Sequence, residues 1–165
     1  MQYAMETIRK QGFLALAVSL ALAPVMAMAQ QPPAGALGIT GTWNHVLTVR
    51  NCATGAVIAV SNPMSAYLES GAAIEMNPLP GAALRTPSLG TWRYLGNQRY
   101  ELSIKYFRYN ADGSFAGKTI IDSDITHLPN DTLAQVAVVR IFNAAGIQVA
   151  SGCATLSSTR FTGND

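Results

Sequence analysis

The sequence predicts an all-β fold, an eight-stranded antiparallel up-and-down β-barrel, from three observations. Short runs of alternating apolar and polar residues recur between turn residues, and none holds the period of an amphipathic helix. Trp43 lies near the start of the first run and Arg160 near the end of the last, where a guanidinium stacked on an indole would join first strand to last. Cys52 directly follows the first run and Cys153 lies in the last, so one pairing of those strands can satisfy both contacts.

Residues 1–29 have the pattern of a secretory signal peptide. Arg9 and Lys10 precede an apolar run over residues 13–23, and Ala27-Met28-Ala29 is a small-x-small cleavage site. The apolar run is too short to span a bilayer, and no cysteine follows the cleavage site to carry a lipid. We therefore expect a protein exported to the periplasm or the medium, as in bacteria, without a membrane anchor.

The remaining chain divides into a short leader and one domain. Residues 30–38 are rich in Gln, Pro, Ala and Gly, which predicts a flexible leader, and residues 39–162 form the predicted barrel. Loss of the signal peptide removes Glu6, Arg9 and Lys10 and leaves nine basic and eight acidic residues. A charge this close to neutral indicates neither a nucleic-acid partner nor an anionic membrane surface.

Each predicted strand is a short alternating run bounded by turn residues. The expected strands cover residues 41–51, 64–69, 72–77, 89–95, 98–109, 117–127, 132–142 and 147–161. We expect a long first connection over residues 53–62 and another loop over residues 82–88. Asn110-Ala111-Asp112-Gly113 and Asn143-Ala144-Ala145-Gly146 suit type I turns followed by a left-handed glycine, so each joins a hairpin.

Alternation also assigns side chains to the inside of the barrel. The expected inward residues are Trp43, His45, Leu47 and Val49 on the first strand, Tyr100, Leu102, Ile104 and Tyr106 on the fifth, and Thr119, Ile121, Ser123 and Ile125 on the sixth.

The cysteines suggest a register for the first and last strands. In an oxidising compartment Cys52 and Cys153 are expected to form a disulfide, with two free thiols as the alternative. If they oppose each other directly, Arg160 opposes His45 and is the diagonal neighbour of Trp43. Trp43 and Arg160 then point inward and both cysteines outward. Adjacent first and last strands favour a closed barrel over a Greek-key sandwich, and we assign these four residues structural roles.

Gly41-Thr42-Trp43 with Arg160 on the closing strand resembles the calycin group, which includes lipocalins, fatty-acid-binding proteins and avidins. The stretch from Gly38 to Trp43 is similar to the start of the streptavidin and avidin family. The resemblance implies a lipocalin-like exported barrel. It does not imply biotin binding, because His45 and Val49 stand where that family has the Asn and Ser that hold biotin. The second lipocalin motif, Thr-Asp-Tyr, and the helix after the barrel are also missing from the sequence.

A barrel of eight strands is just wide enough to be filled by side chains or to hold one small ligand. The large inward groups contrast with small inward residues on the later strands, which leave room for a pocket. The small residues are Ser123, Ala137, Ala150, Gly152 and Ala154, and the candidate ligand-binding residues are His45, Trp92, Tyr94, Tyr100 and Tyr106. We expect non-catalytic binding of a small apolar or aromatic molecule. A fully packed interior is the alternative for the pocket.

Two further functions stay open. Some exported barrels of the calycin group inhibit proteases, and here the leader or the loops would bind the partner protein. An isomerase or cyclase would need inward titratable groups, and only His45 and the inward tyrosines qualify.

We expect no metal and no cofactor. Asp122 and Asp124 share the outward face, and His127 has the opposite parity, so a solvated strand face explains them better than a metal site does. Asn130 begins an Asn-Asp-Thr glycosylation motif, which matters only in a eukaryotic secretory pathway.

Overall fold

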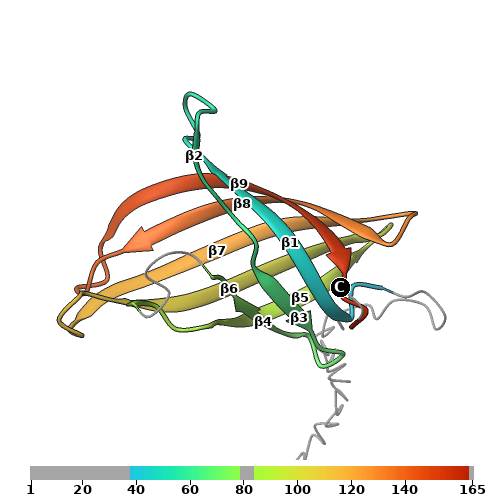
Figure 1. Cartoon of the computed structure of the whole chain (residues 1–165), viewed down its shortest axis with the longest axis horizontal. Helices are drawn as coiled ribbons and strands as arrows, with labels where there is room; N and C mark the ends of the chain where they lie inside the picture. The colour runs from blue at the N-terminus through green and yellow to red at the C-terminus, as the bar shows by residue number, and fades with distance from the viewer. Residues whose placement is uncertain (1–37, 79–83, 164–165) are drawn as a thin grey trace, which may run out of the picture.

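The computed structural model describes residues 38–78 and 84–163, and these residues form an all-β fold without an α-helix (Figure 1). The predicted signal peptide and all but the last residue of the predicted leader lie outside the described residues. The strands are β1 (Gly41–Arg50), β2 (Val57–Ser61), β3 (Met64–Tyr67), β4 (Ala72–Met76), β5 (Ser88–Gly96), β6 (Arg99–Tyr109), β7 (Phe115–Leu128), β8 (Thr132–Phe142) and β9 (Gln148–Arg160).

The barrel closes between its first and last strands. The order is β1-β3-β4-β5-β6-β7-β8-β9, and β9 pairs with β1 along eight residue pairs. Each pair of neighbouring strands in this order is antiparallel. The predicted closed eight-stranded antiparallel barrel is therefore confirmed. No described segment is a helix long and apolar enough to cross a membrane.

One strand was not predicted. Residues 53–62 were expected to be a connection, but Val57–Ser61 forms β2, which pairs with β1. β2 and β3 both pair with β1 in the same register, with Leu47 opposite Ser61 and Asn44 opposite Met64. The two strands therefore lie end to end along β1, with Pro63 between them. The apolar run of β2 does not alternate because most of it is exposed on a hairpin that projects from the barrel (Figure 1).

The predicted disulfide between Cys52 and Cys153 is present, with Cα atoms 5.1 Å apart. The predicted register is wrong by two residues: Trp43 opposes Arg160, His45 opposes Ser158, and Cys153 opposes Arg50. The error arises because Cys52 lies in the turn after β1 and not on the strand, so the disulfide joins residues that are not direct partners. A shift of two residues preserves the face of every side chain.

The contact that suggested barrel closure is present. The Arg160 guanidinium carbon lies 4.3 Å from the centroid of the Trp43 ring, and the indole N–H donates to the Ile39 carbonyl at 2.7 Å. Arg160 also donates to the carbonyls of Thr40 and Gly38 at 2.7 and 3.0 Å. These bonds hold the entry of β1 against the end of β9 and close this end of the barrel.

The core packs directly above the Trp43–Arg160 contact. Trp43, Tyr67 and Tyr100 are almost fully buried there, with Ile125 and Leu133. The side chains expected inside on β1, β6 and β7 are buried or half-buried, which confirms the assignment of faces. The two predicted hairpin turns are also present, at residues 110–113 and 143–146: in each, the fourth-residue glycine has φ near 80° and donates to the first residue's carbonyl.

Candidate functional site

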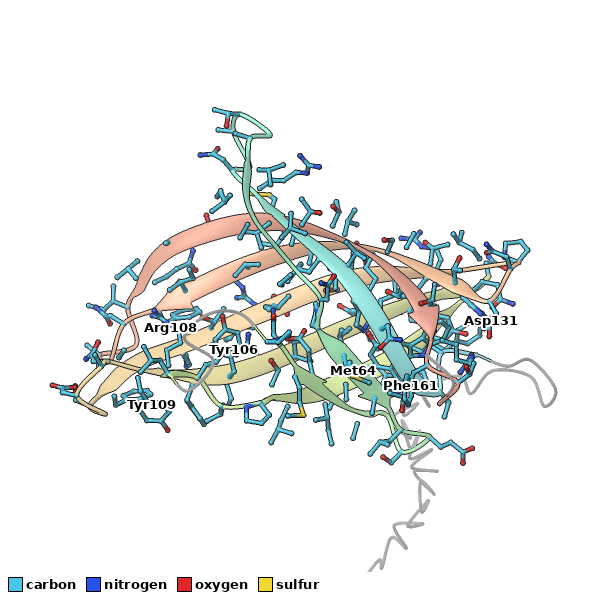
Figure 2. The ribbon with its side chains drawn as sticks, in the orientation of Figure 1. Met64, Tyr106, Arg108, Tyr109, Asp131 and Phe161 are labelled. Atoms are coloured by element: carbon cyan, nitrogen blue, oxygen red, sulfur yellow. A yellow bond between two sulfur atoms is a disulfide. The ribbon has the colours of Figure 1, made fainter. Side chains whose placement is uncertain are left out.

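The barrel interior is not completely filled. A cavity of about 260 Å³ lies between the packed core and the end of the barrel opposite the Trp43–Arg160 contact. Figure 2 shows Tyr106 and Arg108 toward that end, away from Asp131 and Phe161. Much of the lining is aliphatic and comes from β1, β6, β7, β8 and β9: Leu47, Val49, Leu102, Ile121, Val139 and Leu156.

Small side chains leave this space open. Ala137 on β8 and Ala154 on β9 are direct partners, are almost fully buried, and both line the cavity. Of the small residues predicted to leave room, these two and Ser123 on β7 line the cavity. Ala150 differs, because it is exposed near the end of the barrel.

Polar side chains gather on the opposite side of the cavity, where β3 and β4 meet the chain that leads to β5. Glu75 and Arg85 form an ion pair at 3.4 Å with side chains about one-tenth exposed. Arg85 also donates to Ser88 Oγ at 2.7 Å, and its guanidinium carbon lies 3.6 Å from the centroid of the Tyr106 ring. These contacts hold Arg85 over the cavity, although it comes from a loop.

Burial has the largest effect on the pKa of Glu75. Removal from water raises the pKa of this carboxyl, while Arg85 and Ser88 oppose the shift by stabilising the carboxylate. Burial likewise raises the pKa of the neighbouring Tyr67 hydroxyl, and hydrogen bonds with Gln135 and Ser65 act against that shift. Tyr67 therefore stays a neutral hydroxyl in the lining.

The candidate His45 lies in a hydrogen-bond network and does not line the cavity. Its Nδ1 is 2.6 Å from Ser158 Oγ, and Gln135 Nε2 lies 3.3 Å from the same oxygen. Burial lowers the pKa of His45 to about 4, and its Nε2 has no hydrogen-bond partner among the described residues. The imidazole is therefore neutral at physiological pH.

The four aromatic candidates separate into two places. Tyr106 lines the cavity. Tyr100 packs against Tyr94 and Trp92, with ring centroids 5.0 and 5.8 Å apart, and Trp92 Nε1 donates to the Leu68 carbonyl at 3.0 Å. Tyr100 belongs to the core below the cavity, and Trp92 and Tyr94 are partly buried against that core.

Sequence reasoning missed several polar residues of the lining, among them Glu75, Asn77 and Arg85. Alternation contained a signal for two of them, because Ala73, Glu75 and Asn77 share one parity and all three are buried. A carboxylate on an inward face is unusual enough to indicate a site. Arg85 lies on a loop, and no periodic pattern points to it.

The residues weighed as a metal site have other partners. Asp122 pairs with Arg140 and accepts from Ser103 Oγ at 2.7 Å, whereas His127 Nε2 lies 2.9 Å from Asp131 at the closed end. Within residues 38–78 and 84–163, no three His, Cys, Asp or Glu side chains are grouped so that they could hold a metal ion.

A second hollow of about 560 Å³ lies over the outer face of β3 and β4. Outward side chains such as Met64 and Ile74 line it, and it shares Ser65, Asn77 and Arg85 with the barrel cavity. The two hollows therefore adjoin where β4 ends.

The sequence matches none of the protein-family models with which it was compared. It also shows no significant similarity to any curated protein.

Proposed function

We propose that this protein is an exported, lipocalin-like barrel of the calycin group that binds a small, mainly apolar molecule in its cavity without transforming it. The cavity carries this proposal: it is largely aliphatic, and a few polar groups converge on one side of it. The closed end supports the calycin resemblance, since Trp43 and Arg160 stack there. Export is supported by the disulfide, which persists in oxidising compartments.

The size of the cavity limits the ligand. Pockets for small molecules usually enclose about 300–1,000 Å³, and a 150 Å³ apolar cavity can hold benzene. A volume of about 260 Å³ therefore suits a substituted single ring or a compact branched hydrocarbon better than a long acyl chain.

The titratable groups favour binding without catalysis. Glu75, the carboxylate in the lining, is paired through Oε1 with Arg85 and Ser88. His45, one of the groups that an isomerase or cyclase could have used, lies outside the lining of this cavity, and burial keeps the Tyr67 hydroxyl in the lining neutral.

Filling the cavity tests the proposal. Ala154→Leu adds a branched side chain to the lining, so it should reduce binding of a single-ring apolar probe such as p-cymene at least tenfold in isothermal titration calorimetry. Ala134→Leu makes the same change at an exposed position of β8 and should bind like the wild type. If Ala154→Leu binds the probe unchanged, or the wild type binds no small apolar molecule at all, the cavity is not the binding site.

A protein-binding function is the second candidate, and the β1–β2 hairpin favours it. Among the described strands β2 has β1 as its partner and lies at one end of the strand order, so its other edge is unpaired. Val57, Ile58 and Val60 are each more than half exposed on this strand. Such an edge can accept an extended peptide as an added strand.

Inhibition assays against serine and cysteine endopeptidases test the second candidate. An inhibitor acting through this edge should lose potency in Val60→Lys and keep it in Ala154→Leu. Absence of inhibition by the wild-type protein would remove this candidate.

A further inference from the structure

The buried amide of Asn77 is the unexplained group of the cavity. Asn77 is 9 % exposed and lies just beyond β4, on the same inward parity as Glu75. Its Oδ1 is buried and accepts no hydrogen bond from the described residues. Buried polar atoms nearly always have a partner, so an unpaired acceptor beside a cavity points to a ligand that supplies the donor.

The charges beside Asn77 already balance. Among the residues described, the charged groups that line the cavity are Glu75 and Arg85, and they pair with each other. An added carboxylate would face Glu75, and an added ammonium would face Arg85. A neutral head group avoids both repulsions.

We propose that the cavity takes a small neutral alcohol or phenol whose hydroxyl group binds the Asn77 side chain. This inference rests on the proposed function and adds the chemical class of the ligand. A hydroxyl group has one donor and two acceptor lone pairs, so it satisfies the amide whether it meets the oxygen or the nitrogen. The hydrocarbon body then lies against Leu102, Val139 and Leu156.

The adjoining hollow agrees with this orientation. Asn77 lines both the cavity and the outer hollow, so it lies where the two meet. A ligand whose hydroxyl group is held there has its polar end toward the opening and its apolar end in the aliphatic part of the barrel.

The test compares two probes that differ by one hydroxyl group: thymol, a phenol, and p-cymene, the same molecule without the oxygen. Isothermal titration calorimetry with the disulfide-bonded protein should give about tenfold or more tighter binding of thymol, the difference expected for satisfying a buried acceptor. Asn77→Leu should abolish this preference, so that thymol and p-cymene bind about equally. Thr155→Val, an isosteric loss of a hydroxyl on the exposed face of β9, should keep it.

The outcomes separate the two proposals. Equal binding of thymol and p-cymene by the wild type would overturn the hydroxyl assignment and leave the apolar pocket in place. Absence of binding for both probes would overturn the pocket as well. A preference that persists in a folded Asn77→Leu variant would overturn the role of Asn77. Should that variant not fold, Asn77→Ala serves instead. The comparison of thymol with p-cymene in the wild type tests the hydroxyl assignment without any variant.

Discussion

Asp131 connects residues that lie far apart in the sequence at the closed end of the barrel. Its carboxylate accepts from Arg160 Nε at 2.7 Å and lies 2.9 Å from His127 Nε2. Hydrogen bonds from Arg160 and, to a smaller extent, from His127 lower the pKa of Asp131 to about 2 against the opposing effect of burial. The ring of His127 meets Trp43 edge-on, so one carboxylate orients both side chains that flank the indole.

His45 makes the stability of the fold dependent on pH. Its pKa is about 6.5 in an unfolded chain and about 4 in the folded one, because burial disfavours the charged imidazole. The unfolded state therefore binds more protons between these values. Stability is lost as the pH falls through this window, by about 1.4 kcal/mol per unit at most.

We predict that His45→Gln removes this loss. Urea unfolding at about pH 7 and about pH 5 should show a smaller decrease in the variant than in the wild type. Glu75 contributes in the opposite direction, because its pKa is raised in the folded state, but it is present in both proteins and cancels in the comparison. Equal decreases would mean that His45 does not titrate as its burial requires.

At the scale of single elements, glycines decide how closely neighbouring strands approach. Gly90 on β5 pairs with Ile104 on β6, and a Cβ atom at this glycine would overlap the backbone oxygen of Ser103. Gly152 on β9 is also in the middle of a strand, but its nearest neighbour would be Val139 Cβ at 3.9 Å. The same residue type therefore has different importance on two strands of one sheet.

The matched substitutions test this difference. Gly90→Ala should lower the free energy of unfolding by about 3 kcal/mol, because the backbone of β6 must move away. Gly152→Ala should be neutral or stabilise by about 0.4–1 kcal/mol through the unfolded chain. Chemical denaturation measures both, and similar losses at the two positions would contradict the close approach of β5 and β6.

For the whole molecule, the disulfide ties the projecting hairpin to the last strand. Cys52 and Cys153 are 101 residues apart, so their bond encloses most of the barrel. The β1–β9 ladder also closes the barrel without help from the disulfide, through pairs from Trp43 with Arg160 to Arg50 with Cys153. The disulfide therefore acts chiefly on the unfolded chain.

We predict that the double variant Cys52→Ser, Cys153→Ser folds to the same barrel and is about 4–5 kcal/mol less stable, as expected for a loop of about 100 residues. Circular dichroism should show an unchanged β-sheet spectrum, and denaturant unfolding should give the loss. Chemical reduction of the wild type provides the control. Loss of the folded spectrum in both would show that the ladder alone cannot hold the barrel closed.

The sequence by itself determined eight of the nine strands that the described residues form, the faces of those strands and the closed end. Alternation and turn glycines are local signals, and they predicted eight strands and the inward set that includes Trp43 and Tyr100. Trp43 and Arg160 predicted the closure of the barrel, because they can make contact only if the first and last strands are neighbours.

Only the tertiary structure decided that Val57–Ser61 forms the strand β2, how β1 and β9 are aligned, and which residues line the cavity. The two-residue error in register preserved every face, so no local pattern could have exposed it. An unfilled volume depends on how side chains from many strands meet across the barrel, and Arg85 reaches it from a loop because Glu75 and Tyr106 hold it there. Pairing and packing between distant segments, rather than local periodicity, thus placed the candidate site.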